Sequence, residues 1–425
     1  MLDIRFIVAN PNSIKDDLKK RQKADRIWIV DELVQQYDIW RRVKANIDDL
    51  RRKRNELSLQ VNKLKKEKKD ASQVLKQVQD IPQEISQKEQ ELAALEKNIN
   101  EKIIQIPNVT HSSVPKGKDE TENKVIRKIG APAKFSFELK NHVDLAEKLG
   151  IADFEAARQV SGEGFNYLLK ELALLDLAIQ RYGIDFAQKH KFNIVAPPIL
   201  VNKKAMSGVV NFTDFQDTIY KVENEDLYLV GTAENSLVSL FMNRTLNEKD
   251  LPIRIAALTP CFRRELGAHG VDTKGLFRMH QFYKVEQVVF SNSQDSYKIL
   301  EEMQKISEKF FESLKIPIRT IAICSGDLGN KQAKQYDIEA WFPRQKAYKE
   351  VTSASNCTDY QARALNIKYQ KGNEREYVHI LNNTMVATSR AMVAILENFQ
   401  QKDDSVKIPA VLQKYTGFKK IEAPR

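Results

Sequence analysis

The chain has 425 residues, which is enough for two or three domains, and 42% of them are hydrophobic. No apolar run approaches the roughly 20 residues that a membrane-spanning helix needs, and residues 1–5 lack the apolar core of a signal peptide. Three cysteines without CxxC spacing exclude a disulfide framework and a cysteine-rich zinc site. We therefore expect a cytoplasmic protein with no membrane association, and the net charge of +11 favours a polyanionic partner.

A long helical hairpin is predicted over residues 26–106. Its first helix carries the a/d seam of a coiled coil, formed by Ile47, Leu50, Leu57, Val61 and Leu64. Pro82 predicts a kink or a restart in the second helix, which follows a polar turn near residues 68–70. The apolar positions of that second helix lie mostly three or four residues apart: Val74, Val78, Ile81, Ile85, Leu92, Leu95, Ile99, Ile103 and Ile106.

The basic residues of this hairpin gather on its first helix. Residues 41–70 contain 12 basic and 5 acidic residues, whereas residues 71–106 contain 4 basic and 6 acidic ones. A positive stripe of this kind suits a nucleic-acid backbone that is bound through its phosphates and its shape. A purely structural coiled coil is the alternative that these residues alone leave open.

The next segments change in composition. Residues 107–134 contain three prolines and two glycines among charged residues, which predicts a linker. Helices are predicted over residues 154–158 and 165–188, and a strand that ends in proline over residues 192–201. The second helix should be well buried because much of its surface is apolar, at Leu168, Leu169, Leu172, Leu175, Leu177 and Ile179.

Polar residues then follow predicted strands. Residues 227–230 predict a strand that delivers Thr232 and Glu234 to the start of a helix. A carboxylate placed there could meet an ammonium group, and an N-cap is the alternative. A predicted strand at residues 347–357 carries Glu350 and Ser353, hard oxygen ligands of the kind that Mg²⁺ accepts beside phosphate. A solvent-facing strand acid is the alternative for Glu350.

Residues 261–286 predict an antiparallel hairpin with a long connection, because the side chains from 282 to 287 alternate as in a strand. Arg263 and Arg278 provide planar guanidinium groups suited to phosphate, and Phe282 offers a ring on which a base could stack. Taken alone, the stretch also fits a basic surface hairpin. Finally, residues 381–398 predict a strand, a small-residue turn at 383–385 and an apolar helix led by an arginine.

These stretches resemble the three motifs of class II aminoacyl-tRNA synthetases, in the form found in the seryl-tRNA synthetases. Residues 262–286, FRRELGAHGVDTKGLFRMHQFYKVE, match the motif 2 pattern FRxExGxxGxDTxGLxRxHQFxKVE at every fixed position. Residues 350–364 are similar to EVxSxSNCxDxQxRR except at the end, where Ala364 replaces the last arginine. Residues 165–201 resemble motif 1, with Pro198 as its proline, and residues 381–398 resemble motif 3.

The resemblance implies an α+β fold, with an N-terminal antiparallel coiled-coil hairpin and a class II catalytic domain whose antiparallel β-sheet is flanked by helices. We expect a tRNA-binding helical arm at residues 1–110, with the coiled coil at about 26–106, a linker at 111–134 and the catalytic domain at 135–425. The resemblance also implies a homodimer that forms through motif 1.

The activity implied is that of a ligase that activates L-serine with ATP and Mg²⁺ and transfers serine to the 3′ end of tRNA(Ser), with tRNA(Sec) left open as a second acceptor. By the match, the catalytic residues would be Arg263, Glu350 and Arg390. Serine would be bound by Thr232, Ala233, Glu234, Arg263, Glu286, Asn382 and Thr384. ATP would be bound by Arg263, Arg264, Glu265, Met279, His280, Gln281, Phe282, Glu350, Val351, Thr352, Ser353 and Arg390. Glu350 and Ser353 would hold Mg²⁺, and the tRNA would contact Arg51, Arg52, Arg54, Lys63, Lys65 and Lys66.

A few positions depart from the family pattern. Gly231 stands where the family has Pro or Ala, and Val271 and Lys274 stand where arginines are frequent in the motif 2 loop. The stretch at 383–385, Asn-Thr-Met, replaces the bacterial Gly-Ser-Gly and is similar to the archaeal and eukaryotic-cytosolic branch, as is His269.

Two alternatives from other functional classes are kept. A synthetase-like ligase that loads amino acids onto a carrier protein would lack the arm at residues 1–110. A synthetase-like paralogue that binds RNA without aminoacylation would be expected to have lost Arg263, Glu350 or Arg390, and all three are present.

Overall fold

The structure is a computed structural model that describes residues 1–210, 212, 216–265 and 275–423. It divides into two compact units, Met1–Pro107 and Asn108–Arg425, each of which is described by itself. Among the described residues, every helix falls short of the length or the apolar character that crossing a membrane requires.

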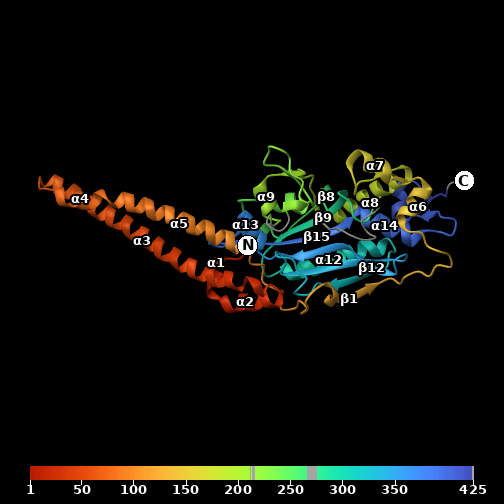
Figure 1. Cartoon of the computed structure of the whole chain (residues 1–425), viewed down its shortest axis with the longest axis horizontal. Helices are drawn as coiled ribbons and strands as arrows, with labels where there is room; N and C mark the ends of the chain where they lie inside the picture. The colour runs from red at the N-terminus through yellow and green to blue at the C-terminus, as the bar shows by residue number, and fades with distance from the viewer. Residues whose placement is uncertain (211, 213–215, 266–274, 424–425) are drawn as a thin grey trace. The chain divides into compact units, whose positions relative to one another are not determined.

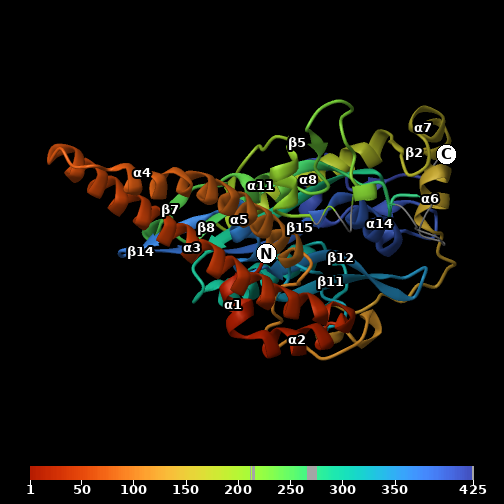
Figure 2. The ribbon, with the colours of Figure 1, turned by 60° about the vertical axis from the view of Figure 1, so that its left-hand side comes forward.

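The first unit is a helical hairpin with two short helices at its base. Figure 1 shows α3 and α5 running side by side, and Figure 2 shows the same pairing from another direction. The helix α3 has 40 residues without interruption, which corresponds to about 60 Å. The helices of this unit are α1 Ile4–Ala9, α2 Pro11–Lys20, α3 Ile27–Lys66, α4 Ser72–Gln79 and α5 Ile81–Ile103.

The two predicted seams face each other across this hairpin. Ile47 and Val61 on α3 and Ile85 and Ile99 on α5 are buried, and the remaining seam residues are buried or partly buried. The predicted restart is also confirmed, because α4 ends just before Asp80 and α5 carries Pro82 in its first turn. A proline there loses no helical hydrogen bond, since the first N–H groups of a helix have no partner within it.

The second unit is built on an eight-stranded sheet with the order β1-β10-β11-β12-β15-β9-β8-β4. All neighbouring strands are antiparallel except β4 and β8, which run parallel. The strands are β1 Lys124–Ile129, β4 Asn193–Ile194, β8 Ile253–Phe262, β9 Gln281–Ser291, β10 Ile318–Ala322, β11 Lys334–Phe342, β12 Ala347–Asn356 and β15 His379–Ala387. The predicted antiparallel sheet is therefore confirmed, and so is the predicted hairpin, which β8 and β9 form.

Three helices pack against this sheet and close the main core: α8 Lys170–Lys189, α12 Ser296–Ser313 and α14 Thr388–Phe399. Figure 1 shows α12 beside β12 and β15. Within the described part of this unit, the remaining α-helices are α6 His142–Leu149, α7 Phe154–Ser161, α9 Lys203–Ser207, α11 Glu234–Ser239, α13 Tyr360–Leu365 and α15 Gln413–Thr416. The small strands are β2 Ala152–Asp153, β3 Tyr167–Leu168, β5 Leu200–Val201, β6 Tyr228–Leu229, β7 Thr245–Asn247, β13 Lys368–Lys371, β14 Glu374–Tyr377, β16 Val406–Lys407 and β17 Lys420–Ile421.

The segment expected to be a linker is part of the second unit. Residues 124–129 form β1, the edge strand that pairs with β10, and Val114 is buried in a small cluster with Ile321 and Ile323. The expectation failed because prolines and glycines among charges are common to linkers and to the turns around a short edge strand.

The motif 1 region also differs from the prediction. The helix α8 begins at Lys170 rather than 165, because residues 167–168 form β3 and the Leu169 N–H donates to Ile151 O. Leu172 and Leu175 are fully buried, whereas Leu177 is 57% exposed, so the apolar surface of the helix is only partly covered. The predicted strand at 192–201 is reduced to β4 and β5, because Pro197 and Pro198 have no N–H to donate.

The predicted turn at residues 383–385 lies inside β15. The strand continues because β12 and β9 hydrogen-bond to it from both sides. A register shift between Thr384 and Val386 leaves Met385 as an extra residue, so a bulge stands where the turn was expected. The helix α14 then starts at Thr388 and carries Arg390 in its first turn, as predicted.

Candidate active site

The strand β9 forms the floor of the site. Its register with β8 pairs Cys261 with Phe282 and Ala257 with Glu286. Phe282, Lys284 and Glu286 share one face because side chains alternate along a strand. The hairpin also fixes Arg263, whose N–H donates to His280 O at 2.9 Å and whose Nε donates to Gly231 O at 3.1 Å.

Glu286 is a buried acid with one oxygen fixed by the protein. Thr384 lies opposite it on β15, and its Oγ1 donates to Glu286 Oε2 at 3.0 Å. Lys284 Nζ lies 2.8 Å from the same oxygen. Burial raises the pKa of Glu286, Lys284 opposes the shift and Glu234 adds to it. Among the described residues no group donates to Glu286 Oε1, so this oxygen is available to a ligand.

Glu234, at the start of α11, repeats this arrangement. Its Oε1 accepts from Lys331 Nζ at 2.6 Å, Gln361 Nε2 at 2.8 Å and Asn382 Nδ2 at 3.0 Å. Its Oε2 accepts no hydrogen bond within the described part of the chain. The N-cap residue of α11 is Ala233, without a side-chain cap, and the residue before it, Thr232, accepts the Glu234 N–H on Oγ1 at 3.3 Å. The Thr232 hydroxyl therefore bonds to the helix backbone, whereas the Glu234 carboxylate bonds to side chains.

A small cavity of about 60 Å³ opens beside Lys284 and Thr384, the two residues that hold Glu286, whereas Glu234 and Glu286 do not themselves line it. Its walls come from the hairpin, from β12 and from the junction of β15 with α14. The predicted residues that line it are Arg263, Glu265, Met279, Phe282, Glu350, Val351, Thr352, Thr384 and Arg390, together with Phe277, Arg278, Lys284, Ala387 and Ser389. The Arg263 guanidinium lies 5.5 Å from the centre of the Phe282 ring.

A bulge in β12 brings two of the predicted oxygen ligands to one face. Glu350 pairs with Glu339 and Thr352 with Ile338, so Val351 is an extra residue without a cross-strand partner. This shift places Glu350 and Ser353, three residues apart, on the same face. Arg390 Nη1 lies 3.0 Å from Glu350 Oε1 and 2.9 Å from Glu350 O.

Asp337, on the neighbouring strand β11, stands opposite Ser353. Burial, together with the nearby Glu350, raises the pKa of Asp337 well above its usual range. The face that carries Glu350 and Ser353 is therefore rich in oxygen atoms that could coordinate a metal ion.

Other predicted residues lie away from the cavity. The Ala233 side chain is fully buried in the core, so only its backbone is available to a ligand. His280 Nδ1 lies 2.6 Å from Tyr220 Oη, and burial lowers the pKa of this imidazole. Arg264 and Gln281 are exposed. The predicted departures at residues 269, 271 and 274 lie outside the described residues.

Three residues that hold the site were not singled out from the sequence. Lys284 could have been found, because it shares the strand face of Phe282 and Glu286. Gln361 lies in the stretch similar to EVxSxSNCxDxQxRR. Lys331 lies in a loop before β11, and no periodicity marks it.

The predicted tRNA contacts lie on α3 in the first unit. Arg51 Nη2 lies 2.7 Å from Glu89 Oε1, and Arg52 Nη2 lies 3.0 Å from Asp49 Oδ1. The other four have no acidic partner among the described residues and are exposed or partly exposed: Arg54, Lys63, Lys65 and Lys66.

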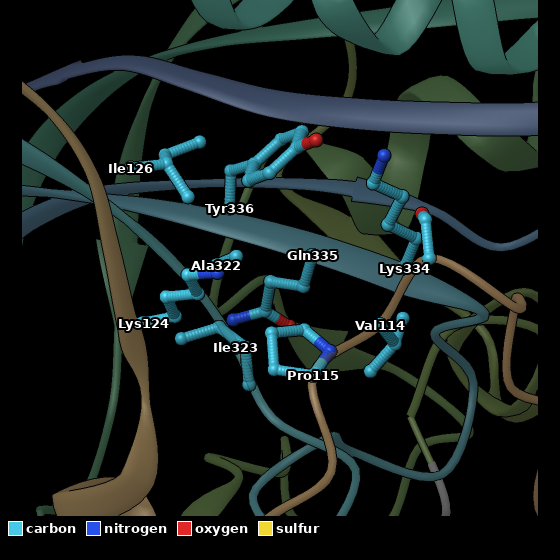
Figure 3. Close-up of a pocket in the computed structure, with 10 residues that line it drawn as sticks. Val114, Pro115, Lys124, Ile126, Ala322, Ile323, Lys334, Gln335 and Tyr336 are labelled. Carbon is cyan, nitrogen blue, oxygen red and sulfur yellow. The ribbon is translucent and has the colours of Figure 1, made fainter.

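A second cavity, of about 270 Å³, lies at the β1 edge of the sheet (Figure 3). Lys334 and Tyr336 line it, and both bond to Glu301 Oε1, at 3.1 and 2.6 Å. None of the predicted site residues borders this cavity.

Comparison with known proteins gives consistent matches over the whole chain. The seryl-tRNA synthetase N-terminal domain matches residues 1–110, and the tRNA synthetase class II core domain (G, H, P, S and T) matches residues 219–399. A Methanospirillum hungatei protein named serine–tRNA ligase is 45% identical over 424 residues, which cover 99% of this chain and 100% of that protein. A Methanocella arvoryzae protein of the same name is 46% identical over 418 residues, 98% of each chain.

Solved structures agree. The crystal structure of seryl-tRNA synthetase from Pyrococcus horikoshii complexed with ATP has a TM-score of 0.95 and 44% identity and covers 100% of both chains. The cytoplasmic serine–tRNA ligase from Naegleria fowleri in complex with AMP has a TM-score of 0.90 and 32% identity over 100% of this chain and 99% of that one. These two curated relatives are archaeal, which agrees with the predicted similarity of the Asn-Thr-Met stretch to the archaeal and eukaryotic-cytosolic branch. The chain therefore belongs to the seryl-tRNA synthetase family of class II aminoacyl-tRNA synthetases.

Proposed function

We propose that this chain activates L-serine with ATP and transfers it to tRNA(Ser), and that the described site carries both steps. One observation supports the choice of serine most directly. Two buried acids, Glu234 and Glu286, each have one oxygen fixed by protein donors and the other free of protein donors within the described residues. Serine brings two donor groups, an ammonium and a hydroxyl, to two such acceptors.

In this proposal Glu234 accepts the ammonium group and Glu286 accepts the hydroxyl. Thr232, Ala233, Asn382 and Thr384 complete the pocket, through their side chains or their backbone. Asn382 and Thr384 already donate to the two acids, so they hold each carboxylate in place. An amino acid without the hydroxyl would leave the free oxygen of Glu286 buried and unpaired, which is the physical basis of discrimination against alanine.

The first step joins the serine carboxylate to the α-phosphate of ATP and releases pyrophosphate. The nucleophile is already ionised, so the protein has only to position the reactants and stabilise charge. Arg263 lines the same cavity as Phe282, Lys284 and Thr384, and there it would bind the serine carboxylate and the α-phosphate. Adenine would stack on Phe282, and Arg390 would bind the γ-phosphate. The remaining ATP contacts would come from Arg264, Glu265, Met279, His280, Gln281, Val351 and Thr352.

Mg²⁺ fits the face of β12 that the bulge creates. Glu350 and Ser353 present hard oxygen donors there, and Mg²⁺ is commonly held by one or two carboxylates together with substrate phosphates. When bound, the ion would neutralise charge on the phosphates. Glu350 would then exchange its ion pair with Arg390 for the metal, which would free that guanidinium for phosphate.

In the second step the 3′-terminal hydroxyl of the tRNA attacks the adenylate carbonyl, and AMP leaves. We assign the tRNA contacts of residues 1–110 to the face of α3 that carries Arg51, Arg52, Arg54, Lys63, Lys65 and Lys66. Four of these cations lack an acidic partner among the described residues, so their charge is available to phosphates. Aminoacylation with tRNA(Sec) in place of tRNA(Ser) tests whether tRNA(Sec) is charged as well.

We also propose a homodimer and a cytoplasmic location. Leu174 and Leu177 on α8 are 47% and 57% exposed, and Ile194 and Leu200 nearby in motif 1 are 40% and 38% exposed. Apolar exposure of this extent favours contact with a second copy. The location is supported by Cys261, Cys324 and Cys357, which are buried free thiols.

The proposed function is tested by ATP–pyrophosphate exchange with each amino acid in turn. Exchange that depends on serine and on no other amino acid is expected. Exchange with threonine or alanine but without serine would refute the assignment. Exchange with serine but no charging of tRNA(Ser) would instead favour the paralogue that lacks aminoacylation.

A further inference from the structure

Lys331 places a positive charge at the amino-group end of the amino acid pocket. Its Nζ lies 2.6 Å from Glu234 Oε1, and its side chain is only 21% exposed. Burial, the largest single effect, lowers the pKa of Lys331, but Glu234, Cys357 and Glu286 together outweigh it, so the pKa is raised overall. The lysine is therefore charged at neutral pH.

The position of this lysine is fixed from its backbone. Asn108, which is 2% exposed, donates from Nδ2 to Lys331 O at 2.9 Å and from its N–H to Asn330 O at 2.7 Å. The same Nδ2 donates to Cys357 O at 2.8 Å, and Cys357 Sγ lies 3.7 Å from Asn382 Nδ2. The loop before β11 is thus bonded to the strand end that borders Glu234, so the ammonium is held in the pocket.

The charges around the pocket are closely matched. Glu234 pairs with Lys331, and Glu286 pairs with Lys284 at 2.8 Å. The formal charges of these four groups sum to zero. Arg263, which lines the same cavity as Lys284, adds one positive charge. A zwitterion brings its own carboxylate for Arg263 and adds no net charge. An amine without a carboxylate brings only a second cation to an acid that already has one.

We propose that Lys331 is a specificity-determining residue that acts as an electrostatic filter: it admits the zwitterionic amino acid and rejects amines that lack the carboxylate. Two cations within a few ångströms of one another in a partly buried site repel strongly. In a zwitterion the carboxylate offsets this repulsion, whereas in a simple amine nothing does. The proposal rests on the proposed function, in which Glu234 receives the ammonium.

The test compares serine with ethanolamine, which has the same hydroxyl and ammonium groups but no carboxylate. Serine-dependent ATP–pyrophosphate exchange is measured in the full chain for the wild type, Lys331→Met and the matched control Lys331→Arg. The readout is the ratio of the ethanolamine inhibition constant to the KM for serine. We expect this ratio to fall by about tenfold or more in Lys331→Met and to stay near the wild-type value in Lys331→Arg.

A purely structural role would weaken both ligands together, because both use Glu234, and the ratio would not move. An unchanged ratio in Lys331→Met therefore overturns the proposal. If Lys331→Met does not support exchange, the ratio of the two dissociation constants, for ethanolamine and for serine, is measured by calorimetry in Lys331→Gln. Loss of binding of both ligands in Lys331→Gln also overturns the proposal. Absence of serine-dependent exchange in the wild type would overturn the proposed function itself, so the two failures are distinguishable.

Discussion

Replacement of Glu286 by Gln tests the hydroxyl pocket with the smallest change in shape. The substitution keeps the side-chain volume and one acceptor oxygen but removes the negative charge. In the wild type, Glu286 Oε2 is held by Thr384 at 3.0 Å and by Lys284 at 2.8 Å. An amide can still accept one of these bonds, while Lys284 loses its counter-charge in a position that is 6% exposed.

The magnitude follows from the difference between charged and neutral hydrogen bonds. A bond to an ionised group contributes about 1.5–3 kcal/mol and a neutral one about 0.5–1.5 kcal/mol. The substrate hydroxyl would therefore lose about 1–1.5 kcal/mol, which corresponds to roughly a tenfold decrease in kcat/KM for serine. The unpaired Lys284 would lower the free energy of unfolding by about 1–3 kcal/mol, which thermal unfolding would detect.

The assay is amino-acid-dependent exchange with serine and with alanine. Alanine has no hydroxyl, so its residual exchange should change little, and the serine-to-alanine ratio should fall. Thr384→Val is the matched control, because it removes one donor to Glu286 and keeps the charge. If serine and alanine exchange fall by the same factor in Glu286→Gln, the hydroxyl does not bind at Glu286 and the reasoning is refuted.

The pH dependence gives a second readout for the same variant. Burial raises the pKa of Glu286, so its carboxyl becomes protonated at a pH above the value of about 4.3 that is usual for Glu. The acceptor for the hydroxyl is then weakened as pH falls through this raised pKa, and the KM for serine should rise in the wild type. Glu286→Gln should not show this rise in the KM for serine at low pH. If the rise persists in the variant, another group causes it.

Three further predictions test the arm, the dimer and the motif 2 hairpin. Deletion of about residues 30–105 should spare serine-dependent exchange and reduce charging of tRNA(Ser) by on the order of a hundredfold; equal charging would contradict the assigned role of α3. Leu177→Asp should shift the protein from dimer to monomer in sedimentation, whereas Leu177→Met should not. Gly275→Ala should lower the free energy of unfolding by about 1–3 kcal/mol, because φ is 100° and an added Cβ would lie 2.4 Å from His142 Nε2. An unchanged melting temperature would contradict this strain.

The residues of the hydroxyl pocket were predictable to different degrees. Alternation along β9 predicts that Phe282, Lys284 and Glu286 share a face, and the structure confirms it. That Lys284 is buried does not follow from β9 alone, since a lysine on a strand is usually solvated. Its burial depends on β15, which places Thr384 opposite Glu286, and pairing between strands almost 100 residues apart leaves no local signal.

The arrangement around Glu350 shows a second limit. Strand periodicity would place Glu350 and Ser353 on opposite faces, because they are three residues apart. The extra residue Val351 reverses that parity, and nothing in the sequence of β12 marks the bulge. A resemblance to a family can name such a pair, whereas the local pattern cannot. Lys331 is the extreme case, since it meets an acid 97 residues away from within a loop.

The two pocket acids suggest how this fold reconciles stability with selectivity. A buried carboxylate without partners would destabilise the protein, and one with all its lone pairs filled by protein donors would have nothing left for a ligand. Here Lys284 and Lys331 neutralise Glu286 and Glu234 on one oxygen each, which stabilises the two buried acids. The second oxygen of each acid is then fixed in position, so a ligand that fails to donate to both leaves a buried acceptor unpaired. Weak binding of alanine would therefore be the direct consequence of how the protein holds the two acids of the pocket.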